Sequence, residues 1–333
     1  MSSPALVNRT LVDSFGRTID YLRLSITDRC NLRCRYCMPS GGVESMSHGE
    51  ILRFEEALRL CRIFAELGIT TIKVTGGEPL VRLGAADMIR ELKALKGVRQ
   101  VTMTSNGVIL GEHLPALVSA GLDAVNISLD TLDEGKFLQL TRTNSVVSVL
   151  AAVDQAVELG LRVKINCVPM KNFNENDIVR LTALAKDRDI GVRFIELMPL
   201  GAACALEPLP ADELISLIES EYGPMKQSAA KLGFGPAVYY KLPEFTGYIG
   251  LISAVSRCFC KSCNRLRLTA SGFLKPCLSS ELGLDLRGLL RSGACDEEIA
   301  EAIQKTAAAK PSGHHFGAAE NGVNKINMFR IGG

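Results

Sequence analysis

Between about residues 21 and 200, short apolar runs of strand character alternate with longer segments of helical periodicity. Six runs are rich in aliphatic and β-branched residues, at positions 21–27, 71–75, 100–104, 124–129, 162–169 and 192–197. In the first helical segment, apolar positions from Ile51 to Phe64 recur at spacings of three and four, and Gly68 follows just beyond the helix. The same glycine punctuation returns before later strands, at Gly121, Gly160 and Gly191. Strand–helix units in series predict a parallel sheet covered by helices.

Both an open doubly wound sheet and a barrel fit this alternation. In a barrel enzyme, functional residues collect at the C-terminal ends of the strands and in the loops that follow. Polar or cysteine-bearing positions fall there in all six units, at 30–37, 76–79, 105–106, 128–130, 166 and 196–198. Because six units are two short of a complete (β/α)8 barrel, we predict an α/β fold with an incomplete (β/α)6 barrel of the TIM type, open on one side.

The pattern changes after residue 200. Residues 206–210 form a proline-punctuated linker, 213–221 have helical periodicity, and 238–268 carry strand and turn signals. Ser271 and Gly272 separate two short apolar runs and indicate a hairpin, and the alanine-rich segment 296–309 is predicted to be helical. We therefore expect two regions, a partial barrel over 1–205 and a smaller α+β extension over 206–333.

The composition of the 333-residue chain narrows its class. Hydrophobic residues make up 47% and charged residues 22%, which allows a sizeable core. A formal net charge of +2 argues against a dedicated nucleic-acid surface. No apolar run reaches the roughly 20 residues that span a bilayer, and the first 25 residues lack the apolar core of a signal peptide. We expect a soluble cytoplasmic protein that binds neither nucleic acid nor membrane.

Cysteine spacing points to metal chemistry. Three of the eleven cysteines, Cys30, Cys34 and Cys37, follow the first strand at Cys-x3-Cys-x2-Cys spacing. Three such thiolates can each bind one iron of a [4Fe–4S] cluster and leave the fourth iron open to a chelating ligand. A structural zinc site is the alternative, but zinc usually requires four closed ligands, and no fourth ligand is near in sequence.

A second set comprises Cys260, Cys263 and Cys277, at Cys-x2-Cys-x13-Cys spacing. Here Cys258 precedes the set at Cys-x-Cys spacing and can make a fourth ligand. Four thiolates would suit a zinc knuckle or a closed electron-transfer cluster, whereas three would again leave one iron open. Spacing alone does not separate these possibilities.

The first set resembles the signature of the radical S-adenosylmethionine (SAM) family. The resemblance extends to Gly76-Gly77-Glu78-Pro79 after the second strand, which is similar to the family's "GGEP" segment. It implies that a reduced cluster on Cys30, Cys34 and Cys37 cleaves SAM to a 5′-deoxyadenosyl radical. By the same resemblance, the residues that contact SAM are Tyr36, Gly77, Ser128 and Met198.

The second set, with Asn264-Arg-Leu-Arg-Leu268 after its second cysteine, resembles the molybdenum cofactor biosynthesis protein A family, the GTP 3′,8-cyclases. The resemblance runs from about residue 17 to 333. It implies a second [4Fe–4S] cluster on Cys260, Cys263 and Cys277, whose open iron binds guanine, and it leaves Cys258 as a spare thiol. The implied reaction joins C3′ of GTP to C8, giving (8S)-3′,8-cyclo-7,8-dihydroguanosine 5′-triphosphate, the first step of molybdopterin biosynthesis. The implied partners are a one-electron reductant and the cyclic pyranopterin monophosphate synthase downstream.

Cations in the predicted strands match that substrate, since a triphosphate carries about three to four negative charges and requires several convergent Lys or Arg groups. The resemblance assigns GTP binding to Arg23, Lys73, Thr104, Lys164, Arg265, Leu266 and Arg267, and we add Arg193. Arg265 and Arg267 are also the candidates for a catalytic role. In the resembled family a terminal Gly-Gly reaches into the active site, which implies the same place for Gly332 and Gly333. His314 and His315 are adjacent and point apart, which disfavours their binding one metal together.

Two rival functions fit parts of the sequence. One is a radical SAM enzyme with an auxiliary cluster that acts on a peptide, although only about 20 residues precede the first strand where a peptide-recognition domain usually lies. The other is a zinc-stabilised interaction module built on residues 258–277. The sequence also leaves open whether the protein is a monomer or a homodimer.

Overall fold

The computed structural model describes residues 10–39, 41–42, 44, 46–314, 316 and 328–332. His315 and Gly333, two positions singled out in the sequence, lie outside these ranges. No helix within the described ranges is long and apolar enough to cross a membrane.

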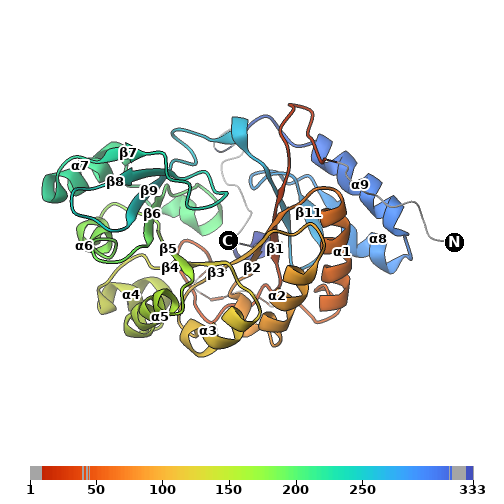
Figure 1. Cartoon of the computed structure of the whole chain (residues 1–333), viewed down its shortest axis with the longest axis horizontal. Coiled ribbons are helices and arrows are strands. Elements are labelled where there is room, and N and C mark those ends of the chain that lie inside the picture. Colours follow the sequence, from red (N-terminus) through yellow and green to blue (C-terminus); the bar gives the residue numbers. More distant parts are fainter. Residues whose placement is uncertain are drawn as a thin grey trace.

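Six parallel strands in chain order form the centre of one sheet. They are β1 (Tyr21–Ser25), β2 (Thr71–Thr75), β3 (Gln100–Ser105), β4 (Ala124–Ser128), β5 (Arg162–Cys167) and β6 (Gly191–Ile195). Each begins within one residue of its predicted start and ends within two residues of its predicted end. The helices that connect them lie outside this curved row (Figure 1). The predicted alternation of strands and helices is confirmed.

The helices of this half are α1 (Phe54–Glu66), α2 (Ala85–Ala94), α3 (Leu110–Ser119), α4 (Glu134–Thr141), α5 (Val146–Glu158) and α6 (Ile178–Ala183). Gly68, Gly121 and Gly160 follow helices with positive φ, as predicted. Gly191 differs, because it is the first residue of β6 and has no positive φ. Packing there is tight, because an added Cβ would lie 3.2 Å from Leu232 Cδ1.

The second half of the chain extends the same sheet at both edges. On one side β10 (Arg265–Leu268) pairs parallel with β1, followed by β11 (Phe273–Lys275) and β12 (Leu284–Asp285). On the other side β9 (Tyr248–Ile252) pairs parallel with β6, followed by β8 (Val238–Lys241) and β7 (Lys226–Ser228). Two further parallel strands thus flank the six that were predicted. The hairpin at Ser271–Gly272 is confirmed, since β10 and β11 are antiparallel and Gly272 has φ +80°.

The remaining helices are α7 (Ala211–Tyr222), α8 (Leu286–Arg291), α9 (Asp296–Ala308) and α10 (Met328–Ile331). Of these, α7 and α9 were predicted. Figure 1 shows α8 and α9 beside β11 and α1, at the opposite end of the molecule from α7.

Strand alternation separates the core from a polar face. In β1, Leu22 and Leu24 are fully buried and belong to the main apolar cluster, which also contains Ile63 and Phe64 of α1. Arg23 lies between them and therefore points to the other side of the sheet. The register aligns Arg23 with Lys73 of β2 on one side and Arg267 of β10 on the other, so three cations from distant segments lie across one face.

Candidate active site

A cavity of about 320 Å³ lies on the polar face of the sheet. Residues of β1 to β6, β8, β9, β10 and α10 line it. Of the predicted site residues, all those assigned to SAM, the first cysteine set, and the GTP residues other than Leu266 line this cavity. Leu266 is fully buried, with its side chain in the apolar core on the other face of β10.

Six cations converge on one part of this cavity: Arg23, Lys73, Lys164, Arg193, Arg265 and Arg267. Arg193 donates to Asn166 Oδ1 from Nε at 2.9 Å and from Nη2 at 2.5 Å. With its amide oxygen turned toward the cations, Asn126 accepts from both Arg193 (2.8 Å) and Lys73. These partners are neutral. Among the described residues, no carboxylate forms an ion pair with any of the six. Arg23 Nε and Arg265 Nε are buried without hydrogen-bond partners.

The pKa values of these groups reflect burial among like charges. Burial first, and then Arg193 and Arg23, hold the pKa of Lys73 well below its usual range. Burial and Arg193 lower the pKa of Lys164 to about 7, and burial lowers that of Arg23 to about 10. Because buried cations are costly without counter-charges, the cavity is suited to a multiply charged anion.

The C-terminal segment reaches these cations. The carbonyl oxygen of Gly332 accepts hydrogen bonds from Arg23 Nη2 at 3.2 Å and Arg267 Nη1 at 3.3 Å. Met328 and Phe329 of α10 line the same cavity. The expectation that the glycine tail enters the site is confirmed for Gly332.

The first cysteine set lines the same cavity as the cations. Burial raises the pKa of Cys30, raises that of Cys34 well above its usual range, and raises that of Cys37 to about 12. For Cys34 the neighbouring Cys37 thiol adds to the effect. Three partly exposed cysteines of one loop that lines the cavity fit a cluster with three protein ligands.

The second cysteine set lies beyond the cavity wall. Cys260, Cys263 and Cys277 do not line the cavity, but their neighbours Phe259, Arg265 and Leu278 do. Lys310 is buried beside the set and donates to the carbonyl oxygens of Arg265 (2.8 Å) and Pro276 (2.5 Å). Although burial acts in the opposite direction, Lys310 and Arg265 lower the pKa of Cys263. This half-buried set with a cation beside it fits a second thiolate-bound cluster.

Comparison with known proteins identifies the family. The Radical SAM superfamily model matches residues 24–185, and the Molybdenum Cofactor Synthesis C model matches residues 190–316. A GTP 3′,8-cyclase of Pelotomaculum thermopropionicum is 42% identical over 325 residues, covering 96% of this chain and 99% of that protein. The GTP 3′,8-cyclase of Moorella thermoacetica is 43% identical with the same coverage. The chain belongs to the GTP 3′,8-cyclase family.

The fold also agrees with a solved structure. Streptococcus suis SuiB bound to S-adenosylmethionine aligns with a TM-score of 0.61, over 85% of this chain and 68% of that one. The sequences are only 14% identical, so this likeness concerns the fold alone. The α/β sheet of this GTP 3′,8-cyclase family member is thus that of a radical SAM protein.

The positions that the family resemblance assigns to SAM line the cavity together with the first cysteine set. Tyr36 donates from its hydroxyl to Asp130 Oδ2 at 2.8 Å, and Ser128 and Met198 stand at or beyond the ends of β4 and β6. Burial raises the pKa of Asp130 to about 6, although the Val168 amide and Tyr36 hydroxyl oppose this. The hydrogen bond to Asp130 orients the Tyr36 ring within the cavity.

The paired glycines of this family segment serve protein packing. A Cβ at Gly77 would lie 2.4 Å from the carbonyl oxygen of Arg29, and one at Gly76 would lie 2.8 Å from that of Thr27. Gly77 N donates to Thr27 O at 2.8 Å. The resemblance implied a SAM contact at Gly77; the contact that excludes a side chain at both glycines is with the segment leading into the cysteine loop.

Several residues that line the cavity were not predicted from the sequence. Asn126 and Asn166 orient Arg193, and the Tyr239 hydroxyl is hydrogen-bonded to it. Residues 232–236 of the segment before β8 also line the cavity, beside Lys164 and Arg193. Asn126 and Asn166 lie on the same face of the sheet as the cations. Their positions in the alternating pattern of the predicted strands could therefore have identified them as cavity residues. Nothing in the local sequence of residues 232–236 indicated their position.

Proposed function

We propose that this chain cyclises GTP to (8S)-3′,8-cyclo-7,8-dihydroguanosine 5′-triphosphate within this cavity, as the first step of molybdenum cofactor biosynthesis. The proposal rests on family membership together with one observation: six cations that have no carboxylate partner among the described residues line the same cavity as Cys30, Cys34 and Cys37. A triphosphate supplies the missing counter-charge. Because the cations and the cysteines line one cavity, a single nucleotide can lie beside both.

Cys30, Cys34 and Cys37 would hold one [4Fe–4S] cluster, with Tyr36, Gly77, Ser128 and Met198 around SAM. With SAM bound, that cluster would supply the radical chemistry directed at C3′ of the ribose. The side chains position the nucleotide and exclude water from it. The hydrogen bond from Tyr36 to buried Asp130 fixes the aromatic ring that would lie beside the adenine.

Arg23, Lys73, Lys164 and Arg193 would bind the triphosphate, with Thr104 beside them. Four cations from two pairs of adjacent strands, β1 with β2 and β5 with β6, can contact separate phosphate oxygens, and Arg can do so bidentately. Because the cations are already placed by strand pairing, little ordering is needed when GTP binds.

Arg265 and Arg267 link the two cysteine sets in this arrangement. Both line the cavity, and Arg265 stacks on Phe259 with its guanidinium carbon 4.8 Å from the ring centroid. We assign them to the guanosine end of GTP and to charge stabilisation during C3′–C8 bond formation. Cys260, Cys263 and Cys277 would hold the second [4Fe–4S] cluster beside the base, and Leu266 would contribute only from the backbone of β10.

For the fold, we propose an incomplete (β/α)6 barrel over 1–205 and an auxiliary-cluster and substrate-binding extension over 206–333. The six central strands in chain order support the partial barrel, whereas the two family models meet earlier in the chain, between residues 185 and 190. A one-electron reductant and a downstream cyclic pyranopterin monophosphate synthase are the expected partners, for a monomeric or homodimeric enzyme.

The test of this function is SAM cleavage in anaerobically reconstituted protein. Dithionite-reduced enzyme should form 5′-deoxyadenosine when GTP is present, together with a product that has GTP's mass and altered ultraviolet absorption. The rival peptide-modifying and zinc-module functions both predict no stimulation by GTP. Absence of GTP-dependent 5′-deoxyadenosine would refute the assignment.

GTP binding should weaken as pH rises above about 7, the pKa of Lys164 in the free site. Phosphate next to the ammonium raises that pKa, so at higher pH each binding event takes up a proton. The apparent Kd should therefore rise by up to about tenfold per pH unit for this group. The number of protons taken up on GTP binding can be measured by calorimetry at pH 8.5 in two buffers that differ in ionisation enthalpy. Lys164→Arg, which stays charged, should reduce the pH slope; an unaltered slope would exclude Lys164 as its source.

Replacing Gly332 with alanine should lower turnover about tenfold or more. The added Cβ would lie 2.6 Å from Thr75 Oγ1, and φ is +74°, so the segment must shift and release the carbonyl from two guanidinium groups. Hydrogen bonds to charged groups contribute about 1.5–3 kcal/mol each. Gly293→Ala is the matched control, because Gly293 also has positive φ but has no atom within 4 Å of the added carbon. Equal kinetics for the two variants would contradict a positioning role of Gly332.

A further inference from the structure

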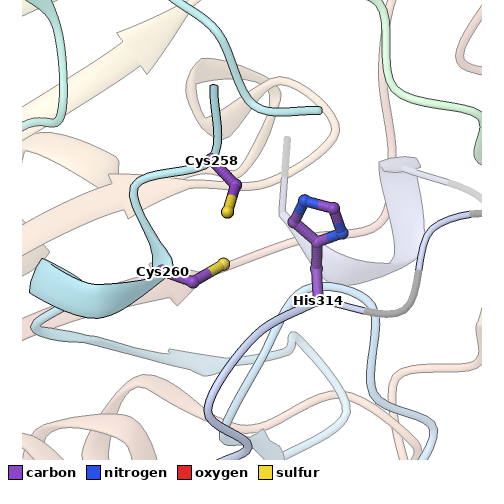
Figure 2. Close-up of side chains that lie close together, drawn as sticks. All are labelled: Cys258, Cys260 and His314. Atoms are coloured by element: carbon purple, nitrogen blue, oxygen red, sulfur yellow. The ribbon is translucent and has the colours of Figure 1, made fainter. Parts of the chain in front are cut away.

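Cys258, Cys260 and His314 form a cluster of metal-binding side chains outside the cavity. Their ligand atoms all lie within 4.8 Å of one another, and none of the three residues lines the cavity. Cys258 and Cys260 flank Phe259, and His314 comes from the loop after α9. Figure 2 shows both sulfur atoms and the imidazole ring facing the same space.

The imidazole of His314 has an unused nitrogen. Its Nδ1 accepts a weak hydrogen bond from the Phe316 amide at 3.3 Å, whereas Nε2 is buried without a hydrogen-bond partner. The backbone N–H of His314 also donates to the Cys260 sulfur, which holds the histidine loop against the cysteine segment. A buried polar atom without a partner is costly in a native fold and requires an explanation.

We infer that Cys258, Cys260 and His314 form a binding site for a thiophilic divalent cation such as Zn²⁺. Two thiolates and an imidazole are ligands that zinc prefers, and the fourth tetrahedral position would be filled by water. Zinc–ligand bonds of about 2.0–2.3 Å place tetrahedral ligand atoms roughly 3.5–3.8 Å apart, so each pair of atoms must approach by at most about 1 Å. The exposed side chain of Cys258 can make this movement and gives the ion access from solvent.

Binding through Nε2 has one identifiable cost. The ring proton then resides on Nδ1, so the weak contact with the Phe316 amide must be given up. A metal–nitrogen bond replaces it and satisfies the buried Nε2. Metal binding therefore gives His314 Nε2 the partner that it lacks in the metal-free fold.

This site shares Cys260 with the second cysteine set, which has a consequence that rests on the proposed cluster assignment. One sulfur cannot complete both sites, so zinc at Cys258, Cys260 and His314 and a [4Fe–4S] cluster at Cys260, Cys263 and Cys277 should exclude each other. The first set, on the far side of the cavity, should be unaffected. Zinc bound at this site during cluster assembly would thus prevent formation of the second cluster.

Binding of Co²⁺, the spectroscopic substitute for Zn²⁺, tests the site in full-length protein stripped of iron. We expect thiolate-to-cobalt charge transfer and the intense visible bands of tetrahedral cobalt. Cys258→Ser and His314→Gln should each weaken binding by roughly a hundredfold, the share of one ligand in a typical zinc site. Cys204→Ser, which removes another exposed cysteine, should leave binding unchanged.

The competing ligand set gives the opposite result. If Co²⁺ binds to Cys260, Cys263 and Cys277, then Cys263→Ser will weaken binding and Cys258→Ser will not, and the inference is overturned. A second measurement uses cluster reconstitution: equimolar Zn²⁺ should lower iron from about eight to about four per chain. Cys258→Ser should retain about eight. These readouts use neither SAM nor GTP, so their failure is distinct from failure of the proposed function.

Discussion

A Cys34→Ser variant is expected to form no 5′-deoxyadenosine above the no-enzyme background, with or without GTP. Cys34 is the middle residue of the first set, and its pKa is raised by burial and by the Cys37 thiol beside it. A serine hydroxyl in the same buried place ionises far less readily and cannot replace a thiolate on iron. Iron analysis after anaerobic reconstitution should fall from about eight to about four per chain.

Two matched variants make this result specific. Cys295→Ser changes an exposed cysteine at the start of α9 and should retain both iron content and SAM cleavage. Cys263→Ser in the second set should also lose about four irons, but it should retain slow SAM cleavage that GTP no longer stimulates. If Cys34→Ser cleaves SAM at the rate of Cys263→Ser, the roles of the two sets are assigned incorrectly.

Arg267→Met is expected to lower kcat/KM for GTP about a hundredfold or more while both clusters are retained. The guanidinium is buried on the cavity side of β10 and contacts Gly332 O at 3.3 Å. A bidentate contact to the nucleotide contributes two charge-assisted hydrogen bonds of about 1.5–3 kcal/mol each. Methionine keeps much of the side-chain volume, so the loss reports on charge and hydrogen bonding.

Stability measurements separate this effect from misfolding. Burial, Arg23 and Arg265 together hold the pKa of Arg267 well below its usual range, so the cation destabilises the GTP-free fold. Without GTP, the melting temperature of Arg267→Met should equal or exceed that of the parent protein. The rise in melting temperature on adding GTP should shrink. Arg90→Ala, which removes an exposed arginine paired with Asp87, serves as the control. A lower melting temperature with unchanged GTP kinetics would place Arg267 in the fold and not in the site.

Local patterns predicted the strands because their signals are short-range. The β1–β6 segments are apolar runs bounded by glycines and polar loops, and the first cysteine set lies within eight residues of one loop. Most predicted cavity residues were likewise on strands whose alternation sets the direction of each side chain. Leu266 shows the limit, since its neighbours Arg265 and Arg267 enter the cavity while its own side chain must point to the core.

The sequence by itself determined the chemistry: two cysteine sets, a parallel strand–helix series and cations inside strands. The tertiary structure decided which of these meet. Arg23 and Arg267 are separated by most of the chain, yet the parallel pairing of β1 with β10 aligns them, and Gly332 O joins both. Pairing between distant strands depends on the packing of the whole sheet, which no local pattern encodes. For the same reason, only the folded chain brings His314 beside Cys258 and Cys260.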